Sequence, residues 1–292
     1  MRSILPAAAA LACLSAPAIA QDIRPPADDD IAIVVTGNRD IKKTIRQFVD
    51  TLTRSPGTRQ LARFEQRICP RVFGLRAPAA AKVTTRMRLV SAAVTRDVAP
   101  EKCVPNVMLV VTRDKAAFMR EVARGRDNLF DGMSGNKIRS LVRDQSPVTA
   151  WQVMGASLAA DGRVISEEGT LGFQTNRTTE ASTRIRPAVR QQFDFAVVVV
   201  DARVIDGLNT TQLADYATMR ALASLDPSAL AADAPSILRA IDAPADAEVP
   251  LSLTAWDYGF LRGLYKTQTN LYATQQRSVI AREVEKKVVA ER

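Results

Sequence analysis

The strongest constraint on the fold is a run of six apolar residues, Phe195–Val200, in which both alternating sets of side chains are hydrophobic. Successive side chains of a β-strand point to opposite sides of its sheet. A strand that is apolar on both sides is typical of the interior of a sheet, where neither side meets water. We therefore expect Arg190–Asp201 to be the central strand of the protein.

Other segments predict strands and helices that pack around this strand. Apolar or β-branched runs predict further strands at Ile31–Thr36, Val107–Val111, Val148–Met154 and Val164–Phe173. Helical spacing of apolar residues predicts helices at Ile41–Leu52, Val83–Val94, Asn136–Val142, Thr210–Leu225, Ala255–Tyr265 and Thr269–Ala290, with others around Phe118 and near Ile237. Pro56–Pro78 is expected to be irregular, and Asp161 and Gly162 predict a turn.

The chain shows no internal repeat and no interior segment that divides it. We therefore expect a single α+β domain over residues 31–292, in which amphipathic helices pack a mixed β-sheet and the chain ends in helices.

Polar residues predict how several helices begin. Asn38 and Thr112 precede helical patterns and are expected to be N-caps. Asn209 and Gln212 have the three-residue spacing of a capping box, which explains both residues structurally. Asp215 is then expected to be a first-turn acid that the helix dipole favours. On this interpretation, alanine replaces Gln212 or Asp215 at small cost.

The first twenty residues have the pattern of a cleavable signal peptide. Arg2 gives a positive start, Ile4–Cys13 is a short apolar stretch, and Ala18 and Ala20 are small residues suited to cleavage after Ala20. A membrane anchor is the alternative, but it needs about 20 apolar residues. A lipoprotein signal would use Cys13, and the residues before Cys13 fit that pattern poorly.

Cleavage after Ala20 would leave a periplasmic or secreted chain. It would begin with a flexible lead-in over residues 21–30, which contains two prolines and three consecutive aspartates. No later apolar run approaches the length of a membrane span, so no transmembrane segment is expected in the mature chain.

Two cysteines, Cys69 and Cys103, would remain after cleavage. An isolated pair in an oxidising compartment most simply forms one disulfide, here between two loop ends that flank a helix. Closing the loop of about 35 residues between the two cysteines stabilises the fold by about 4 kcal/mol in the chain-entropy model. The absence of a Cys-x-x-Cys motif favours a structural role over a redox role.

The absence of histidine from all 292 residues limits the possible chemistry. It excludes Ser-His-Asp and Cys-His catalysis, histidine zinc sites and imidazole general bases. The formal charge of +9 is spread along the chain, which does not favour nucleic-acid binding in an exported protein. Attraction to an anionic envelope polymer or to lipid headgroups is the functional interpretation of this charge, and a solvated basic surface is the structural one.

Two short motifs resemble parts of known families. Ile33–Arg39, with the sequence IVVTGNR, resembles the segment that opens the plug of TonB-dependent outer-membrane receptors. The chain lacks the strand pattern of their barrel, so we interpret this segment as an ordinary first strand. Ser134 and Lys137 match the Ser-x-x-Lys pattern of serine acyltransferases such as penicillin-binding proteins. The companion Lys-Thr-Gly element is missing, so we predict no catalytic role for this pair.

A longer segment resembles the core of zincin-like metallopeptidases and a related exported bacterial family of unknown function. The resemblance is carried by the buried strand from Val197, the glycine-bearing loop and alanine-rich helix that reach Leu225, and the later elements Thr254–Asp257 and Leu264–Tyr265. It implies a degenerate zincin-like fold.

Active zincins carry His-Glu-x-x-His on this helix, where two imidazoles bind Zn²⁺ and the glutamate activates water. The matching positions here are Thr211, Gln212 and Asp215, and none of them carries the family's residue. We therefore expect no bound metal, and no other cofactor is predicted.

No residue is predicted to be catalytic. The binding candidates are polar or aromatic residues near the central strand and in the zincin-like elements: Asp201, Asp206, Gln212, Asp215, Trp256 and Asp257. We expect a non-catalytic binding or accessory module of the envelope, whose partner is an anionic envelope polymer or another envelope protein.

The alternative is a histidine-free hydrolase that acts on peptidoglycan or glycan through two carboxylates. Two converging carboxylates with one raised pKa would favour the hydrolase. A wide groove lined by Trp, Tyr and Arg would favour binding.

Overall fold

A computed structural model of the chain describes residues 38–292, except for 55–59, 96, 126–127, 169–172, 177–182, 184–185, 242, 245–246, 269 and 292. The predicted signal peptide, the lead-in and the predicted strand at Ile31–Thr36 lie outside the described residues.

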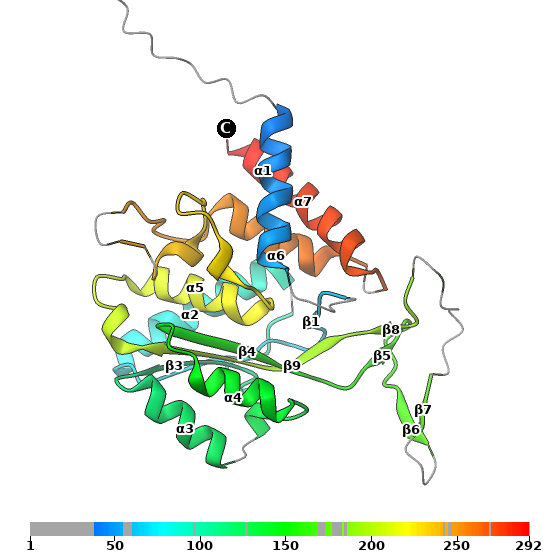
Figure 1. The fold of residues 1–292 in the computed structure, drawn as a ribbon, viewed down its shortest axis with the longest axis horizontal. Coiled ribbons are helices and arrows are strands. Elements are labelled where there is room, and N and C mark those ends of the chain that lie inside the picture. The colour runs from blue at the N-terminus through cyan, green and yellow to red at the C-terminus, as the bar shows by residue number, and fades with distance from the viewer. Residues whose placement is uncertain are drawn as a thin grey trace, which may run out of the picture. The chain divides into compact units, whose positions relative to one another are not determined.

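The central strand predicted from the sequence is β9 (Gln192–Asp201), and it has neighbours on both edges (Figure 1). On one edge it pairs antiparallel with β4 (Val148–Met154). On the other edge it runs parallel to β1 (Arg63–Phe64) near its start and to β3 (Val107–Thr112) further along. The strand β2 (Pro70–Phe73) continues the sheet beyond β3, also parallel. The sheet is therefore mixed, as predicted, and β4 and β2 form its outer edges.

The two sides of the sheet face separate hydrophobic clusters because β9 is apolar at successive positions. Val197 and Val199 pack on the side covered by α3 (Lys115–Gly125) and α4 (Gly135–Arg143). The residues that alternate with them belong to the larger cluster on the other side: Ala196, Val198 and Val200. Full burial of one such valine side chain stabilises the fold by about 1.5–3 kcal/mol.

Five helices pack on the side of the larger cluster, with α2 and α5 next to the sheet (Figure 1): α1 (Asn38–Leu52), α2 (Ala77–Thr95), α5 (Thr210–Leu222), α6 (Ala255–Lys266) and α7 (Ala273–Ala290). The α6 and α7 backbones pass close together at Gly259, where a Cβ atom would lie 2.6 Å from the Cα of Val284. The sequence places a residue without a side chain where the two helices meet.

The remaining elements are short. Two small antiparallel pairs join β5 (Leu158–Ala159) to β8 (Val189–Arg190) and β6 (Ser166–Glu168) to β7 (Phe173–Thr175). The 3₁₀ helices are η1 (Asn128–Phe130), η2 (Ala202–Val204), η3 (Pro227–Ala229) and η4 (Ile237–Arg239). The turn predicted at Asp161 and Gly162 is present, with a φ of +88° at Gly162.

The structure corrects three local predictions. Pro56–Pro78 is not wholly irregular, because it contains β1 and β2, which are too short to give a periodic signal. Val164–Phe173 is not one strand, since β6 and β7 pair as antiparallel neighbours. Thr112 is the last residue of β3 rather than a cap; the carboxylate of Asp114 accepts the N–H of Ala117 in the first turn of α3.

The predicted disulfide is present, with the sulfur atoms of Cys69 and Cys103 1.95 Å apart. Cys69 directly precedes β2, and Cys103 lies shortly before β3, so the bridge ties the approaches to two paired strands on either side of α2. In the part of the chain that the structure describes, no helix is long and apolar enough to cross a membrane.

Candidate binding cleft

Asp215 does not occupy the helix position that we predicted for it. It lies beyond the first turn of α5 and is fully buried. Its two carboxylate oxygens each accept a hydrogen bond of 2.7 Å from the guanidinium of Arg86 on α2, and Oδ2 also accepts the N–H of Leu253. The position that would carry a zincin zinc ligand therefore holds a buried ion pair, and we now expect its replacement to be costly.

Gln212 has the structural role that its spacing predicts. It forms the capping box of α5 with Asn209, in which each side chain accepts the backbone N–H of the other residue. Its side-chain nitrogen also donates to the carbonyl oxygen of Pro250 at 3.0 Å. Both polar atoms of its side chain are thus used to hold the start of α5.

Asp257 and Trp256 also support the fold. The buried carboxylate of Asp257 accepts hydrogen bonds from the Ser236 hydroxyl and the Ile237 N–H, and it completes the capping box of α6 with Thr254. Burial raises the pKa of Asp257, and these hydrogen bonds oppose the rise. The ring of Trp256 packs edge-on against Phe48, with 5.3 Å between the ring centroids.

Asp201 and Asp206 lie after the central strand, as predicted, but in different environments. The buried carboxylate of Asp201 caps η2 and pairs with Arg203, whose Nη2 lies 2.6 Å from Oδ2. Hydrogen bonds from the side chain and backbone of Arg203 lower the pKa of Asp201 to about 2. Asp206 is exposed on the following loop.

The Ser-x-x-Lys motif is explained by the start of a helix. Ser134 is the N-cap of α4, and its hydroxyl accepts the backbone N–H of Lys137.

A cleft of about 690 Å³ lies along the outer edge of β4, which pairs with no other strand among the described residues. In Figure 1, β4 lies between α4 and α5. One wall comes from α4 and the turn before it: Met133, Lys137 and Leu141. The other wall comes from α5 and the segment that follows it, including Tyr216, Arg220, Leu238 and Arg239. Trp151 from β4 also lines the cleft, but Trp151 and Tyr216 are both buried, at 2% and 0% exposure.

The pairing of β4 with β9 determines which backbone groups face the cleft. The N–H of Asp201 donates to the carbonyl of Pro147, so residue 147 and every second residue after it point toward β9. The N–H and C=O groups of Val148, Ala150 and Gln152 therefore point outward. The carbonyl of Val148 accepts the hydroxyl of Ser146. Ala150 and Gln152 therefore present both a backbone donor and an acceptor to the cleft, and Val148 presents its N–H.

The side chain of Gln152 ties the cleft wall to the sheet. Its nitrogen donates to the carbonyl oxygens of Arg220 and Ala223, at 2.7 and 3.1 Å. These carbonyls lie at the end of α5, where a helix leaves its last C=O groups without partners. The C-terminal end of α5 is thereby held beside the free edge of β4.

Arg220 brings a buried positive charge to this wall. Only 9% of the residue is exposed. Its Nη1 donates to the Tyr216 hydroxyl at 2.9 Å, and its guanidinium carbon lies 5.8 Å from the centroid of the Tyr216 ring. Among the described residues, no carboxylate lies within ion-pair distance of Arg220. Buried charges are normally paired, so this arginine is exceptional.

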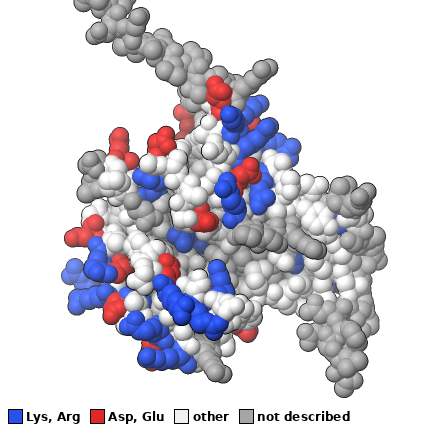
Figure 2. Space-filling model, viewed as in Figure 1, with Lys and Arg blue, Asp and Glu red and all other residues white. Residues whose placement is uncertain are grey.

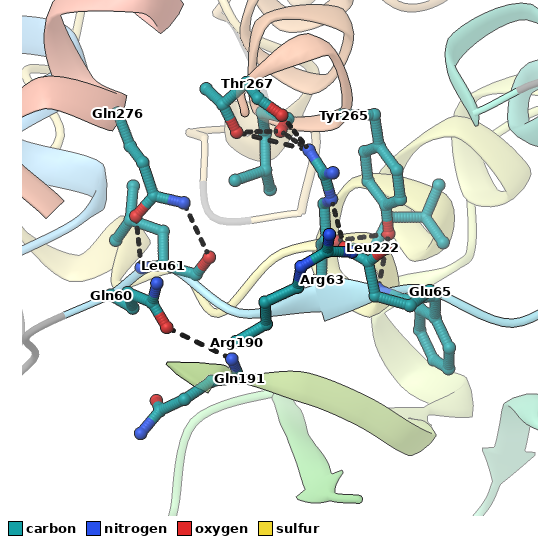
Figure 3. Close-up of polar contacts among 12 residues, drawn as sticks. Gln60, Leu61, Arg63, Glu65, Arg190, Gln191, Leu222, Tyr265, Thr267 and Gln276 are labelled. Atoms are coloured by element: carbon teal, nitrogen blue, oxygen red, sulfur yellow. Dashed lines mark hydrogen bonds and ion pairs between the residues drawn. The ribbon is translucent and has the colours of Figure 1, made fainter. Parts of the chain in front are cut away.

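A second buried arginine, Arg63, lies in a cluster whose polar groups pair with one another (Figure 3). Its Nε donates to Glu65 at 2.9 Å, and its Nη1 donates to the carbonyls of Leu264 and Thr267 at 2.7 and 2.9 Å. The Tyr265 hydroxyl in the same cluster donates to a carbonyl oxygen of α5 and accepts the N–H of Phe64. These bonds join β1 to α6, which makes the cluster structural.

Gln276 extends this cluster to α7. Its side-chain oxygen accepts the N–H of Leu61 at 2.7 Å, and its nitrogen donates to the Leu61 carbonyl at 3.2 Å (Figure 3). One amide thus satisfies both backbone groups of a residue next to β1.

The buried amine of Lys115 holds two residues of the cleft wall, Asp144 and Thr149. Its Nζ donates to the carbonyl of Asp144 at 2.8 Å and to the Thr149 hydroxyl at 2.6 Å. Burial lowers the pKa of Lys115. Partial burial acts to raise the pKa of Asp144, but hydrogen bonds from Thr149 and Ser146 and the charge of Lys115 outweigh it and leave the pKa below its usual value. This carboxylate is suited to remain ionised rather than to donate a proton.

None of the six predicted binding candidates lines this cleft. The residues that do were not predicted, because they come from separate segments that only the tertiary fold brings together. One signal was present in the sequence: Arg220 is a charged residue inside the apolar part of a buried helix, between Met219 and Ala221.

No protein-family model matches the chain, and neither the curated proteins nor the solved structures include a significant match to it. The resemblance to the zincin-like family therefore stays a prediction from the sequence.

Proposed function

We propose that the protein is a non-catalytic binding module of the bacterial envelope, which holds an extended segment of another polypeptide along the outer edge of β4. The observation that carries this proposal is the free edge of a strand lying inside a two-walled cleft. An extended peptide can add to such an edge as a new strand, through backbone hydrogen bonds to Ala150 and Gln152.

The walls of the cleft fit the side chains of an added strand. Successive side chains of that strand would point alternately to the α4 wall and to the α5 wall. Met133 and Leu141 give the α4 wall apolar surface beside the exposed Lys137, while Arg220 gives the α5 wall a charged group. A glycan has no regular row of backbone donors and acceptors, so the edge favours a polypeptide over an envelope polysaccharide.

Export to the envelope is the second part of the proposal. It is supported by the signal-peptide pattern of residues 1–20 and by the disulfide, since disulfides persist mainly in oxidising compartments. The partner would then be another protein of the envelope. The competing hydrolase needs a carboxylic acid that can donate a proton, and the lowered pKa of Asp144 does not favour that role.

Selection from a phage-displayed library of random dodecapeptides, with the full chain as bait, tests this function. The variant Ala150→Pro removes one outward N–H, and proline is tolerated at an edge position whose N–H is not needed by the sheet. The control Ala150→Ser keeps that N–H.

We expect synthetic versions of the selected peptides to bind the unmodified chain and Ala150→Ser alike, and to bind Ala150→Pro at least tenfold more weakly. Equal binding to all three proteins, or no enriched peptide, would contradict strand addition at β4.

A further inference from the structure

We propose that Arg220 selects an acidic side chain, aspartate or glutamate, in the segment bound along β4. This inference rests on the proposed function and names the chemical class of the partner. The first step is the burial of Arg220: the residue is only 9% exposed, it lines the cleft, and its guanidinium makes one hydrogen bond, to the uncharged Tyr216 hydroxyl. A carboxylate bound there would supply the charge partner that the described part of the chain lacks.

The second step is the position of Arg220 along the edge. Gln152 holds the backbone of Arg220 against β4, and β4 continues past Gln152 to Met154. A strand that follows the edge would therefore extend to both sides of Arg220, and the carboxylate would come from a side chain rather than from the end of the peptide.

The third step is the balance of charge around the cleft. Arg239, on the same wall as Arg220, has a buried Nε with no hydrogen-bond partner among the described residues. The carboxylates of the cleft are already used within the chain: Asp144 accepts bonds from Thr149 and Ser146, and Asp226 accepts bonds from Ser228.

The surface beside the cleft extends this positive charge. Figure 2 shows basic side chains gathered over α3 and α4, and the exposed ones on these helices include Lys137, Arg139 and Arg143 of α4 and Arg120 and Arg124 of α3. Such a surface steers an acidic partner toward the cleft and disfavours a neutral or basic one, including a second copy of this basic chain.

The two walls together define the pattern of the segment. A residue facing Arg220 would be acidic, and its neighbours in sequence would face the α4 wall, where Met133 and Leu141 favour apolar side chains. The partner is thus an extended polypeptide in which an acidic residue lies between apolar ones.

The test uses the tightest-binding peptide from the library, in three synthetic forms. One form is unchanged, one has its acidic residues replaced by the isosteric amides, and one has an amidated C-terminus. Each is titrated against the unmodified chain, Arg220→Gln, Arg220→Lys and the control Arg71→Gln. Arg71 is exposed on β2, at the opposite edge of the sheet, so the control makes the same charge change away from the cleft.

We expect the amide form to bind the unmodified chain and Arg71→Gln at least tenfold more weakly than the acidic form. The difference should fall below twofold in Arg220→Gln and be intermediate in Arg220→Lys, which keeps the charge but not the planar guanidinium. C-terminal amidation should change affinity less than twofold. Each comparison is a ratio of the affinities of two peptides for the same protein. A loss of stability in a variant weakens both affinities and therefore does not change this ratio.

Equal binding of the acidic and amide forms to the unmodified chain, with Ala150→Pro still impaired, would overturn the role of Arg220 and leave strand addition standing. A large effect of C-terminal amidation would also overturn it, because the carboxylate would then be the peptide terminus. If no peptide bound Ala150→Pro more weakly than the unmodified chain, the proposed function and this inference would both be overturned.

Discussion

Arg63 and Arg220 are equally buried, at 9% exposure each, and each lies over a tyrosine ring, but among the described residues only Arg63 has a carboxylate partner. Arg63 pairs with Glu65 and donates to two carbonyl oxygens near the end of α6, so the fold itself supplies its partners. Arg220 lines a cleft and has one uncharged partner. A buried charge that the fold satisfies holds the fold together, whereas a buried charge left open at a cleft is available to a ligand.

The largest effect in this comparison is expected from Arg63→Met. The substitution leaves Glu65 and the carbonyls of Leu264 and Thr267 without their buried donor, which should lower the free energy of unfolding by about 3–5 kcal/mol. Urea unfolding followed by circular dichroism measures it. A loss below about 1 kcal/mol, the range of exposed salt bridges, would show that the cluster is not structural.

Asp215→Ala should cost somewhat less. It removes a buried carboxylate with three hydrogen bonds, but the Arg86 side chain that remains is 35% exposed and can reach water. We expect a loss of about 2–3 kcal/mol in the same unfolding measurement. Asp206→Ala, at an exposed loop carboxylate, is the matched control and should stay within about 0.5 kcal/mol of the unmodified chain. Equal effects of the two substitutions would contradict the buried pair.

Arg220→Met should have a small effect on stability, in contrast to Arg63→Met. It removes a buried charge without a carboxylate partner and loses one hydrogen bond to Tyr216, so the free energy of unfolding should change by less than about 1 kcal/mol in either direction. A loss as large as that of Arg63→Met would mean that Arg220 supports the fold rather than a ligand.

The smallest effect concerns Asp201, whose partner Arg203 has an 83% exposed side chain and is therefore well screened. The hydrogen bonds from Arg203 lower the pKa of Asp201 from 3.8 to about 2. Since the folded-state pKa is lowered, the stabilisation is fully present above about pH 4 and is lost as the pH falls toward 2. Asp201→Asn should therefore be less stable than the unmodified chain at pH 5, and most of the difference should be lost at pH 2. A difference that is the same at both pH values would exclude this titration.

The sequence predicts the parts of the fold that are long and periodic. The double-sided apolar pattern of Phe195–Val200 identifies the central strand, and helical spacing identifies the helices, because both patterns arise from local geometry. β1 and β2 are missed because two and four residues carry no period. The role of Asp215 is misread because its partner Arg86 lies 129 residues away in the chain.

The cleft could not be predicted for a different reason. Whether β4 lies inside the sheet or at its edge depends on which strands pair with it, and that is decided by the whole fold rather than by the residues Val148–Met154. Arg220 shows the same limit: its place in an apolar helix marks it as unusual, but only its surroundings distinguish it from Arg63.

Amide hydrogen exchange of β4, measured by NMR with and without the selected peptide, tests the central claim most directly. In the free protein the N–H groups of Ala150 and Gln152 face the cleft, while that of Trp151 faces β9. Strand addition predicts that the peptide slows exchange at Ala150 and Gln152 at least tenfold, with Trp151 already slow and changed little. If the peptide slowed hydrogen exchange at neither Ala150 nor Gln152, or slowed it only in another part of the molecule, binding along the edge of β4 would be contradicted.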